Sequence, residues 1–283
     1  MKILITGQNG YVGNKFAAWL KQWPEDYKVD FISVRDNEWK KRDFSEYDVL
    51  FHTAALVHKK EKLELSELYD KVNRDLTVEL SKKAKEDKVS QFVFLSSMAV
   101  FGVEGSTRRE VIIGNSTTEQ PSTLYGKSKF KAENEIKEME SENFKVTIIR
   151  PPIIYGPDCP GNYSKLKKLV LITPLFPRIN NKRSMLYIDN LSDYIRGLID
   201  RGERGTFHPQ NKQYVDIQEL VNQIASTNHK RIVFSSLLAR FISIIPEFKI
   251  FNKLFGSLVY DYKLSGDNLV EVEEFENTIK KSN

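Results

Sequence analysis

The first 150 residues alternate short apolar segments with amphipathic ones, and this alternation constrains the fold more than any other feature. The apolar segments are rich in β-branched and aromatic residues, as strands buried on both faces are: KILIT, KVDFISV, DVLFHTA, QFVFLSS and KVTIIR. Residues with helical spacing lie between them, notably over about 63–87 and 122–143. Strands that alternate with helices predict an α/β, Rossmann-type, doubly wound parallel sheet.

The pattern changes after residue 150. Six prolines fall between residues 151 and 177, so the regular alternation ends there. We therefore expect a smaller C-terminal lobe that binds the substrate. The expected dinucleotide-binding domain covers residues 1–156, with 185–204 returning to it, and the lobe covers 157–184 and 205–283.

Composition excludes several classes of protein. The chain has 283 residues, of which 40% are hydrophobic and 29% are charged with mixed sign, so it can bury a core and is not expected to be disordered. Its net charge of +5 is spread among acidic and apolar positions, which indicates solvated helix faces rather than a nucleic-acid surface. One cysteine and four dispersed histidines predict neither an internal disulfide nor a metal site.

The sequence favours a cytoplasmic protein. Met1 leads directly into an apolar strand without a leader pattern, and no apolar run is long enough for a membrane span. The most apolar part of the lobe is Ser235–Tyr260, which Pro246 interrupts. We expect a pair of helices that closes over the lobe there, with an interfacial membrane helix as the alternative because Arg240 and Lys249 accompany the apolar residues.

The stretch TGQNGYVG follows the first strand and opens the first helix. In a doubly wound sheet, ligands bind at the carboxyl ends of the strands. Gly7 permits the tight turn, Gly10 lets the backbone approach a pyrophosphate, and Gly13 lets the helix pack close to the sheet. The helix N-terminus adds free N–H groups and partial positive charge. We therefore predict a dinucleotide site that also includes the loop residues Asn9, Tyr11 and Val12.

The segment YGKSK places Tyr125 and Lys129 four residues apart, on one face of a predicted helix. A phenol has a pKa of about 10, and a nearby ammonium group with an oxidised nicotinamide would lower it, so that the tyrosine could shuttle a proton. The spacing alone favours a coincidental surface pair. A second signal is FLSSMAVFG, where Ser96 and Ser97 end a strand and a hydroxyl could bind the reacting oxygen.

Together these motifs resemble the extended short-chain dehydrogenase/reductases, specifically the NAD-dependent epimerase/dehydratase family, which acts on nucleotide sugars. The matching segments follow the order of the family over about residues 2–195: TGQNGYVG, HTAALVH, YDKVNRDLT, LSSMAVFG, YGKSK, RPPIIYGP and RSMLYIDNL. The C-terminal third fits the family pattern more loosely.

The resemblance implies roles for individual residues. It implies that Ser97, Tyr125 and Lys129 are catalytic and that Asn73 supports the active-site helix beside the cofactor. It further implies that four short segments border the cofactor: Ala54 and Ala55 under the pyrophosphate and ribose, Asp43 at the adenine, and Pro152 and Ile153 at the nicotinamide. A solvated loop carboxylate is the alternative for Asp43, and a rigid turn is the alternative for the proline segment.

Differences from the family pattern narrow the expected reaction. The sugar-nucleotide 4,6-dehydratases of the family carry Asp-Glu directly after the catalytic Ser or Thr, whereas this chain has Met98 and Ala99, which argues against a dehydratase. Longer segments resemble reductases of bacterial surface-polysaccharide clusters that act on UDP-4-keto-6-deoxy-N-acetylhexosamines. We expect such a 4-reductase; a UDP-sugar 4-epimerase and a non-catalytic NAD(P)-binding regulator are the alternatives.

The same resemblance implies how the ligands are held. Asn162 and Arg183 fall where related enzymes contact the two phosphates of UDP, although a helix N-cap and a rim salt bridge would explain them too. Arg35 follows the second strand, where a guanidinium could pair with a 2′-phosphate, so NADP is slightly favoured over NAD. Asp36 comes next, and a shift of one residue would reverse that preference. A homodimer is possible.

Overall fold

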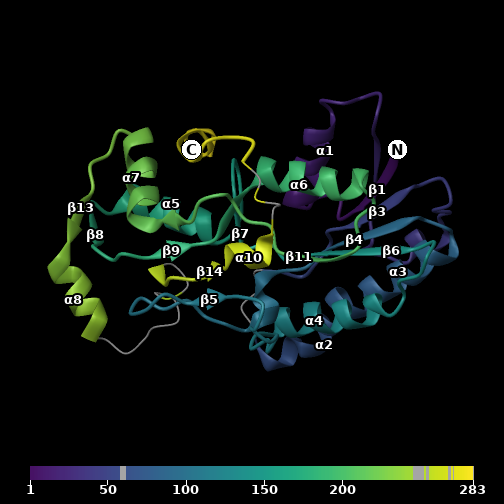
Figure 1. Ribbon diagram of the computed structural model, residues 1–283, viewed down its shortest axis with the longest axis horizontal. Helices are drawn as coiled ribbons and strands as arrows, with labels where there is room; N and C mark the ends of the chain where they lie inside the picture. The colour runs from purple at the N-terminus through teal and green to yellow at the C-terminus, as the bar shows by residue number, and fades with distance from the viewer. Residues whose placement is uncertain (58–61, 245–251, 253–254, 267–268, 270, 283) are drawn as a thin grey trace. The chain divides into compact units, whose positions relative to one another are not determined.

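The computed structural model describes residues 1–283 except 58–61, 245–251, 253–254, 267–268, 270 and 283. The chain forms two compact units, each built from segments that are distant in the sequence (Figure 1). The first unit comprises Met1–Gly102, Thr118–Pro151 and Ser192–His208. The second comprises Val103–Thr117, Pro152–Leu191 and Pro209–Asn283.

The centre of the first unit is a six-stranded sheet in which all neighbours are parallel. Its spatial order is β2-β1-β3-β4-β6-β11. From the first strand, β1, the chain passes to β2 on one side, and the later strands are then added one after another on the other side of β1. This order confirms the predicted Rossmann-type doubly wound sheet. The strands are β1 (Lys2–Thr6), β2 (Lys28–Ile32), β3 (Val49–His52), β4 (Gln91–Leu95), β6 (Lys145–Ile149) and β11 (Gly205–Phe207).

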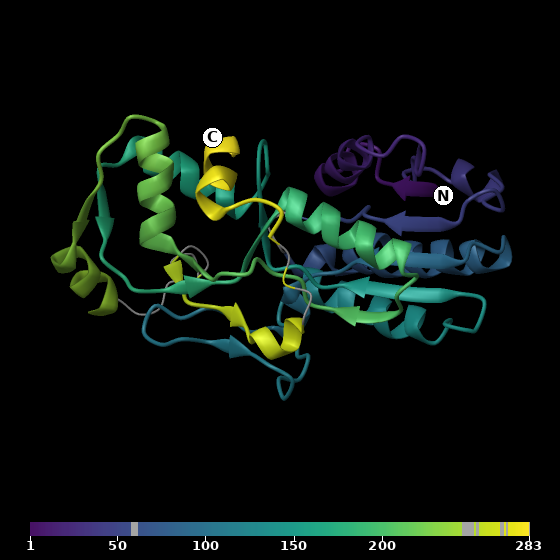
Figure 2. The same ribbon diagram turned by 45° about the horizontal axis from the view of Figure 1, so that its top comes forward.

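Helices cover both faces of this sheet, as Figures 1 and 2 show. The helices are α1 (Tyr11–Leu20), α2 (Ser66–Asp70), α3 (Leu76–Glu86), α4 (Leu124–Lys137) and α6 (Ile188–Asp200). The expected long helix over 63–87 is composite, because a 3-10 turn (Leu63–Leu65) precedes α2 and a π turn (Lys71–Asp75) joins α2 to α3. Further 3-10 turns are η1 (Glu38–Lys41) and η4 (Met98–Phe101).

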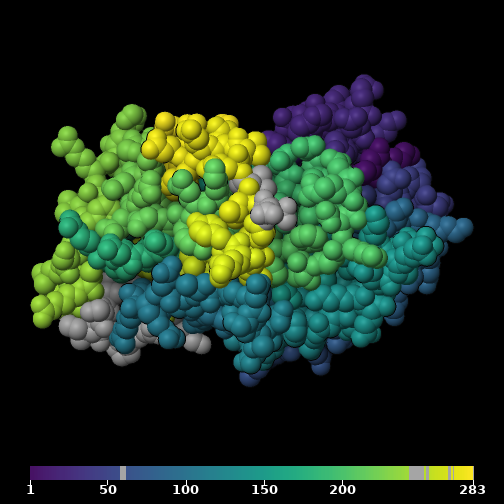
Figure 3. All heavy atoms as spheres, viewed as in Figure 1, coloured from purple at the N-terminus to yellow at the C-terminus, as the bar shows by residue number. Residues whose placement is uncertain are grey.

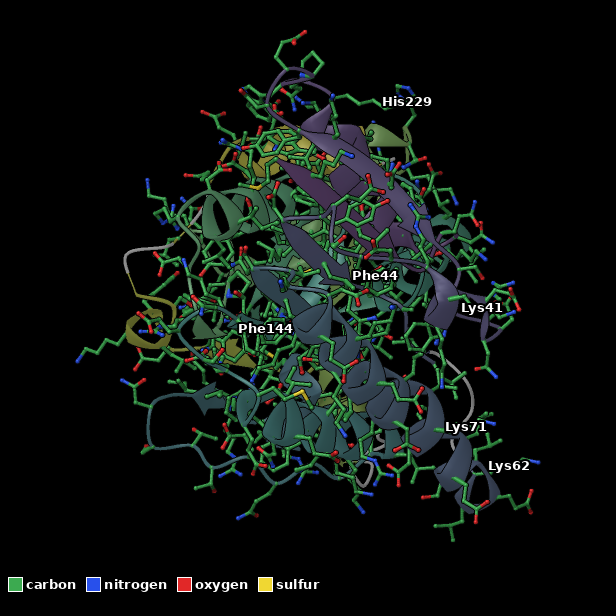
Figure 4. All side chains as sticks on the ribbon, turned by 90° about the vertical axis from the view of Figure 1, so that its right-hand side faces the viewer. Lys41, Phe44, Lys62, Lys71, Phe144 and His229 are labelled. Atoms are coloured by element: carbon green, nitrogen blue, oxygen red, sulfur yellow. The ribbon has the colours of Figure 1, made fainter. Side chains whose placement is uncertain are left out.

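The core of the first unit forms because the central strands bury nearly every side chain. Phe92, Phe94 and Ile148 have no exposed surface and pack with Phe44 and Phe144 from the connecting segments. Figure 4 shows Phe44 and Phe144 within the body of the ribbon, while the labelled lysines project from its rim. Burial of large apolar side chains contributes about 1.5–3 kcal/mol each relative to exposure, and this stabilises the sheet on which the site is built.

The second unit contains four two-stranded ribbons and several short helices. β7 pairs with β10, β12 with β9, β13 with β8, and β14 with β5. The strands are β5 (Ile112–Ile113), β7 (Ile153–Tyr155), β8 (Leu175–Pro177), β9 (Lys182–Arg183), β10 (Met185–Tyr187), β12 (Val215–Asp216), β13 (Val233–Ser235) and β14 (Val259–Tyr260). The helices are α5 (Asn162–Ile172), α7 (Ile217–Thr227), α8 (Ser236–Ile244), α10 (Tyr262–Ser265) and α11 (Phe275–Lys281).

The boundaries of the two units differ from those expected from the sequence. Residues 103–117 pack in the second unit because β5 pairs with β14 there, and residues 152–191 join it because β7 pairs with β10. The segment that returns to the first unit is Ser192–His208 rather than 185–204. Among the described residues, no helix has the length and apolar character needed to cross a bilayer.

Candidate active site

The glycine loop folds tightly at the carboxyl end of β1. Gly7 has φ +89°, a conformation that side chains rarely adopt, and a Cβ there would lie 3.2 Å from the Ala54 Cα. The Gly10 N–H donates to the Gly7 carbonyl at 2.7 Å, and the Gly7 N–H donates to the Ile32 carbonyl at 3.3 Å. The loop therefore meets the ends of both β2 and β3, where the phosphates of a dinucleotide bind in this fold.

The start of α1 is suited to an anion. Gly10 is its N-cap, no side chain caps the helix, and no acidic residue lies in its first turn. Gly13 is buried, and a Cβ there would lie 3.0 Å from Ile5 Cγ2, so a larger residue would crowd this close approach of helix to sheet. The sequence did not point to Asn14, whose amide donates to the carbonyls of Gln8 (2.9 Å) and Gly10 (2.8 Å) and braces the loop. This geometry fits a pyrophosphate.

A buried hydrogen-bond network connects the strands below the glycine loop with the helical segment that follows β3. Thr6 Oγ1 lies 2.7 Å from His52 Nδ1, and His52 Nε2 lies 2.9 Å from Thr77 Oγ1. The Thr77 hydroxyl donates to the Asn73 carbonyl at 2.8 Å. Burial, followed by repulsion from Lys129, holds the pKa of His52 well below its usual value, so this imidazole is neutral and structural.

Asn73 extends this network to the helix that carries the expected catalytic pair. Its side-chain oxygen accepts from the Leu56 N–H at 2.7 Å, and its amide donates to the Leu56 carbonyl at 3.2 Å and to Ser128 Oγ at 3.1 Å. The Ser128 hydroxyl then donates to the Tyr125 carbonyl at 2.9 Å. The structure thus places Asn73 between the loop after β3 and α4. Ser128 was not anticipated, although it lies within YGKSK.

Ser97 and Tyr125 are hydrogen-bonded through their side chains. Ser97 lies between β4 and η4 and is the N-cap of η4. Its Oγ accepts from the Ala99 N–H at 3.2 Å. Thr123 caps α4 by accepting from the Gly126 N–H at 3.0 Å. A Cβ at Gly126 would lie 2.5 Å from the Ala99 carbonyl oxygen, so glycine lets the start of α4 approach η4 and brings Tyr125 to Ser97.

Lys129 lies one turn after Tyr125 and is buried. Its Nζ donates to the Leu95 carbonyl at 2.8 Å and lies 4.4 Å from the centre of the Phe94 ring. Burial lowers the pKa of Lys129 to about 7, although the negative charge of Glu133 raises it. Burial raises the pKa of Tyr125 to about 12, and the hydrogen bond with Ser97 opposes this rise. In the chain by itself the Tyr125 pKa is therefore shifted upward, opposite to the lowering expected from Lys129 with a cofactor.

A buried ionic cluster lies on the same helix, two turns beyond Tyr125. Arg150 directly follows β6. It donates to both Glu133 oxygens, at 2.6 Å from Nη2 to Oε2, and to Glu119 Oε1 at 2.6 Å. The Ser96 hydroxyl also donates to Glu133. The exposed fraction is 3% for the Arg150 side chain and 0% for that of Glu133. The cluster fixes α4 between the ends of β4 and β6, and the sequence did not indicate it.

The residues expected to contact the cofactor are distributed over both units. Ala54 and Ala55 follow β3, and Ala54 lies against Gly7. Pro152 and Ile153 lie in the second unit at the start of β7. Two further candidates, Arg35 and Asp43, are exposed. Asp43 accepts hydrogen bonds from the Ser45 N–H and hydroxyl at 2.8 Å each, and these bonds lower the pKa of its carboxyl.

The two residues expected at the diphosphate lie in the second unit. Asn162 is the first residue of α5 and Gly161 is the N-cap, so Asn162 does not cap the helix. Arg183 in β9 is buried, and it donates to the carbonyls of Gly256 (2.6 Å) and Asn252 (2.7 Å). Burial lowers its pKa to about 10. No carboxylate pairs with Arg183 within the described part of the chain, so it does not form the rim salt bridge that was the alternative.

Searching the described residues for a metal site finds no group of three His, Cys, Asp or Glu side chains that could hold an ion. A phenol hydrogen-bonded to a hydroxyl, with a buried amine one turn away and the glycine loop in the same unit, is suited to proton transfer coupled to redox chemistry on a dinucleotide.

Comparison with known proteins agrees with this geometry. Residues 3–205 match the NAD dependent epimerase/dehydratase family. The chain is 30% identical to a UDP-glucose 4-epimerase of Vibrio cholerae, over 98% of this chain and 89% of that protein. It is 24% identical to an N-acetyl-α-D-glucosaminyl-diphospho-ditrans,octacis-undecaprenol 4-epimerase of Escherichia coli O157:H7, over 81% of this chain and 73% of that protein.

A solved structure resembles the whole chain. It is a dTDP-4-dehydrorhamnose reductase from Clostridium acetobutylicum, with a TM-score of 0.74 and 20% identity. The match covers 99% of this chain and 97% of that one. At this level of identity the likeness shows that the fold is shared.

Proposed function

Because the chain belongs to the NAD-dependent epimerase/dehydratase family, we propose that it transfers hydride to carbon 4 of a UDP-linked sugar, reducing a UDP-4-keto-6-deoxy-N-acetylhexosamine for surface-polysaccharide biosynthesis. In coarser terms, it is an NAD(P)-dependent nucleotide-sugar enzyme of the epimerase/reductase type. The proposal rests on one observation, the hydrogen bond between the side chains of Ser97 and Tyr125. Tyr125 lies on α4, the helix that also contains Lys129.

The three residues have distinct roles in the proposed reaction. Tyr125 holds a proton at its Oη, since its pKa is raised to about 12, and delivers it to the carbonyl oxygen at carbon 4. The Ser97 hydroxyl hydrogen-bonds the same oxygen and stabilises the charge that develops there. Lys129 orients the cofactor ribose and, when charged, stabilises the phenolate that Tyr125 becomes once it has given up its proton. The bound dinucleotide supplies the hydride.

The proposed contacts with the dinucleotide start from the glycine loop. Gly7, Gly10 and Gly13, with the open N-terminus of α1, would bind the pyrophosphate. The remaining proposed contacts are Asn9, Tyr11 and Val12 in the loop, Asp43 at the adenine, Ala54 and Ala55 at the ribose, Asn73, Tyr125 and Lys129 near the reacting end, and Pro152 and Ile153 at the nicotinamide.

We propose that Arg35 recognises the 2′-phosphate of NADP. It is exposed three residues after the end of β2, where the adenine ribose binds in this fold. Replacing Arg35 by Ala is expected to raise the Kd for NADP about tenfold and to leave the Kd for NAD unchanged, as fluorescence titration would measure. Lys41→Ala is the control, because Lys41 is an exposed cation on nearby η1. An unchanged Kd for NADP in the Arg35 variant would contradict this assignment.

We propose that Arg183 and Asn162 hold the diphosphate of UDP. Among the described residues, the buried Arg183 guanidinium bonds to two carbonyls and pairs with no carboxylate, so it keeps a charge that a diphosphate would balance. An Arg can bind a diphosphate through two hydrogen bonds. Calorimetry is expected to show that Arg183→Ala weakens UDP binding by at least about tenfold, or roughly 1.4 kcal/mol. Arg183→Lys, which keeps the charge, should retain part of the affinity.

Control measurements separate this effect from misfolding. Arg178→Ala removes an exposed cation from the end of the neighbouring β8–β13 ribbon and should leave UDP binding unchanged. Melting curves establish that the Arg183 variants are folded. A folded Arg183→Ala protein that binds UDP as tightly as wild type would mean that the substrate class has been misassigned.

A 4-epimerase is the second candidate, and a specific observation favours it: both relatives described above are named 4-epimerases. Such an enzyme would use Ser97, Tyr125 and Lys129 in the same way, oxidising and then reducing carbon 4 while the sugar rotates. The two activities differ in whether reduced cofactor is consumed.

Cofactor stoichiometry tests the proposed function. Purified enzyme would receive UDP-4-keto-6-deoxy-N-acetylglucosamine with NADPH or NADH, and absorbance of the reduced cofactor would be followed. Oxidation of one cofactor per sugar is expected. Interconversion of UDP-glucose or UDP-N-acetylglucosamine with its 4-epimer, without net cofactor use, would show that the enzyme is a 4-epimerase and not a reductase. Cofactor binding without turnover of either substrate would indicate a regulator.

A further inference from the structure

Five large apolar side chains are exposed on one ribbon and its adjoining helices in the second unit. Their exposed fractions lie between 45% and 78%: Ile172, Leu175, Val233, Leu237 and Phe241. These residues define what we call the β8–α8 face. Single exposed apolar residues are ordinary, but a group of this size on a few adjoining elements marks an interaction surface.

The exposure follows from the local geometry of the ribbon. Leu175 and Val233 are register partners in the parallel pair of β8 and β13. Side chains alternate along a strand, so Phe176 points to the opposite side, where it is 2% exposed and its ring centre lies 6.3 Å from that of Phe255. The inner side of the ribbon is therefore filled, and Leu175 and Val233 remain outside.

Helix α8 continues this surface directly from β13. Leu237 and Phe241 are four residues apart and lie on one face of the helix, and both are exposed. β8, β13 and α8 lie side by side in Figures 1 and 2, and the yellow-green atoms of this segment form part of the surface in Figure 3. The side chains of Leu237 and Phe241 thus face solvent rather than the core of their unit.

The same segments carry only positive charge. Residues 162–178 and 229–244 contain seven Lys or Arg and no Asp or Glu, although the chain as a whole has 38 acidic residues. On α5, Lys165 and Lys168 are exposed and share a face with Ile172. Lys230 and Arg231 are exposed immediately before β13. Cations therefore border the exposed apolar residues on several adjoining elements.

The exposed apolar residues and the cations that border them together indicate what binds to the β8–α8 face. A second copy of the chain would bring like charges together, which disfavours self-association through it. Large aliphatic side chains insert into the interfacial layer of a bilayer, and Lys and Arg are attracted to anionic headgroups. We propose that the β8–α8 face docks the protein on the surface of a bilayer that contains anionic phospholipid.

Exposure of Leu237 and Phe241 favours an interfacial membrane helix over a closing helix pair for the described start of the apolar stretch Ser235–Tyr260. A helix pair that closes over the lobe would bury its apolar side, whereas Leu237 and Phe241 are exposed. Residues 245–251 and 253–254 of that stretch lie outside the described residues. Docking of this kind needs no spanning helix, and it goes beyond the proposed function because it holds whichever sugar is the substrate.

Sedimentation with vesicles tests the proposal on the full chain. We expect binding to vesicles of phosphatidylcholine with phosphatidylglycerol, and little binding to phosphatidylcholine alone. Binding should weaken as salt rises from about 0.1 M to 1 M, where the screening length falls from about 10 Å to 3 Å. The double variants Leu237→Gln/Phe241→Gln and Lys230→Glu/Arg231→Glu are each expected to bind at least about tenfold less, through loss of apolar contact and of charge.

Leu63→Gln is the matched control, because Leu63 is 89% exposed but lies in the first unit, and its binding should equal that of wild type. The Leu237/Phe241 variant should keep its melting temperature and its turnover of a water-soluble nucleotide sugar. If the Leu237/Phe241 variant does not fold, vesicle binding by the Lys230/Arg231 variant decides the question. Equal vesicle binding by wild type and both double variants would overturn the proposal. So would a halved molecular mass in the Leu237/Phe241 variant, which would identify the face as a contact between copies.

Discussion

Replacing Tyr125 by Phe is expected to lower kcat on the nucleotide sugar by about 10²- to 10⁴-fold, the usual contribution of a positioned general acid. The phenylalanine keeps the ring on α4 but removes the hydroxyl that is hydrogen-bonded to Ser97. Because no proton donor replaces it at that point, the loss should be in kcat rather than in cofactor affinity. Steady-state kinetics together with fluorescence titration of NAD(P) would separate the two quantities.

Tyr27→Phe provides a matched control. The Tyr27 hydroxyl donates to Asp200 at 2.6 Å on an exposed part of the first unit, so its removal should leave kcat and NAD(P) affinity unchanged. A Tyr125→Phe enzyme that retained most of its kcat would show that another group moves the proton. The part of the Lys129 role that concerns the Tyr125 phenolate would then lose its basis as well.

The fold of the first unit could be predicted from the sequence because the pattern that encodes it is local. Each strand is a short apolar run, each helix repeats apolar residues at its own spacing, and the glycine loop lies between the first strand and the first helix. The six-stranded parallel sheet confirms this prediction. The positive φ of Gly7 and the close approach of Gly13 to Ile5 also follow from local constraints on glycine.

Interactions between distant residues could not be predicted in this way. The π turn at Lys71–Asp75 interrupts the expected long helix where Asn73 bonds to Leu56 and Ser128, which are 17 and 55 residues away. Apolar spacing contains no information on such partners. Arg183 is a similar case, because the carbonyls that it binds belong to residues 69 and 73 positions later in the chain. The sequence could indicate the arginine but not its burial.

The domain boundaries also depend on pairing between segments that are distant in the sequence. The proline-rich stretch after residue 150 marks the end of the alternating pattern, yet it does not show where residues 103–117 pack. Their placement follows from pairing between β5 and β14, which are separated by about half of the chain's length. Short strands of two residues leave little trace in an apolar pattern.

Replacing Arg150 by Met is expected to lower the free energy of unfolding by about 3–5 kcal/mol, since it leaves the buried Glu133 carboxylate without its cation. Glu119 is 31% exposed and can be solvated, but Glu133 has no exposed surface. Among the described residues, it would keep the Ser96 hydroxyl as its hydrogen-bond donor. For a unit of this size, such a loss corresponds to a melting temperature lower by about 6–20 °C. Calorimetry on the full chain would measure it.

A double variant identifies burial of charge as the cause. Arg150→Met/Glu133→Leu removes both charges and fills the space with apolar groups, so it should regain most of the stability that Arg150→Met loses. Arg201→Met is the control, because the Arg201–Glu203 pair is exposed and contributes at most about 1 kcal/mol. If the double variant were as unstable as Arg150→Met, the arginine would act through packing against the Phe101 ring, 5.1 Å away, rather than through the ion pair. The cluster would then support α4 by shape, and the position of Lys129, one turn before Glu133, would not depend on charge.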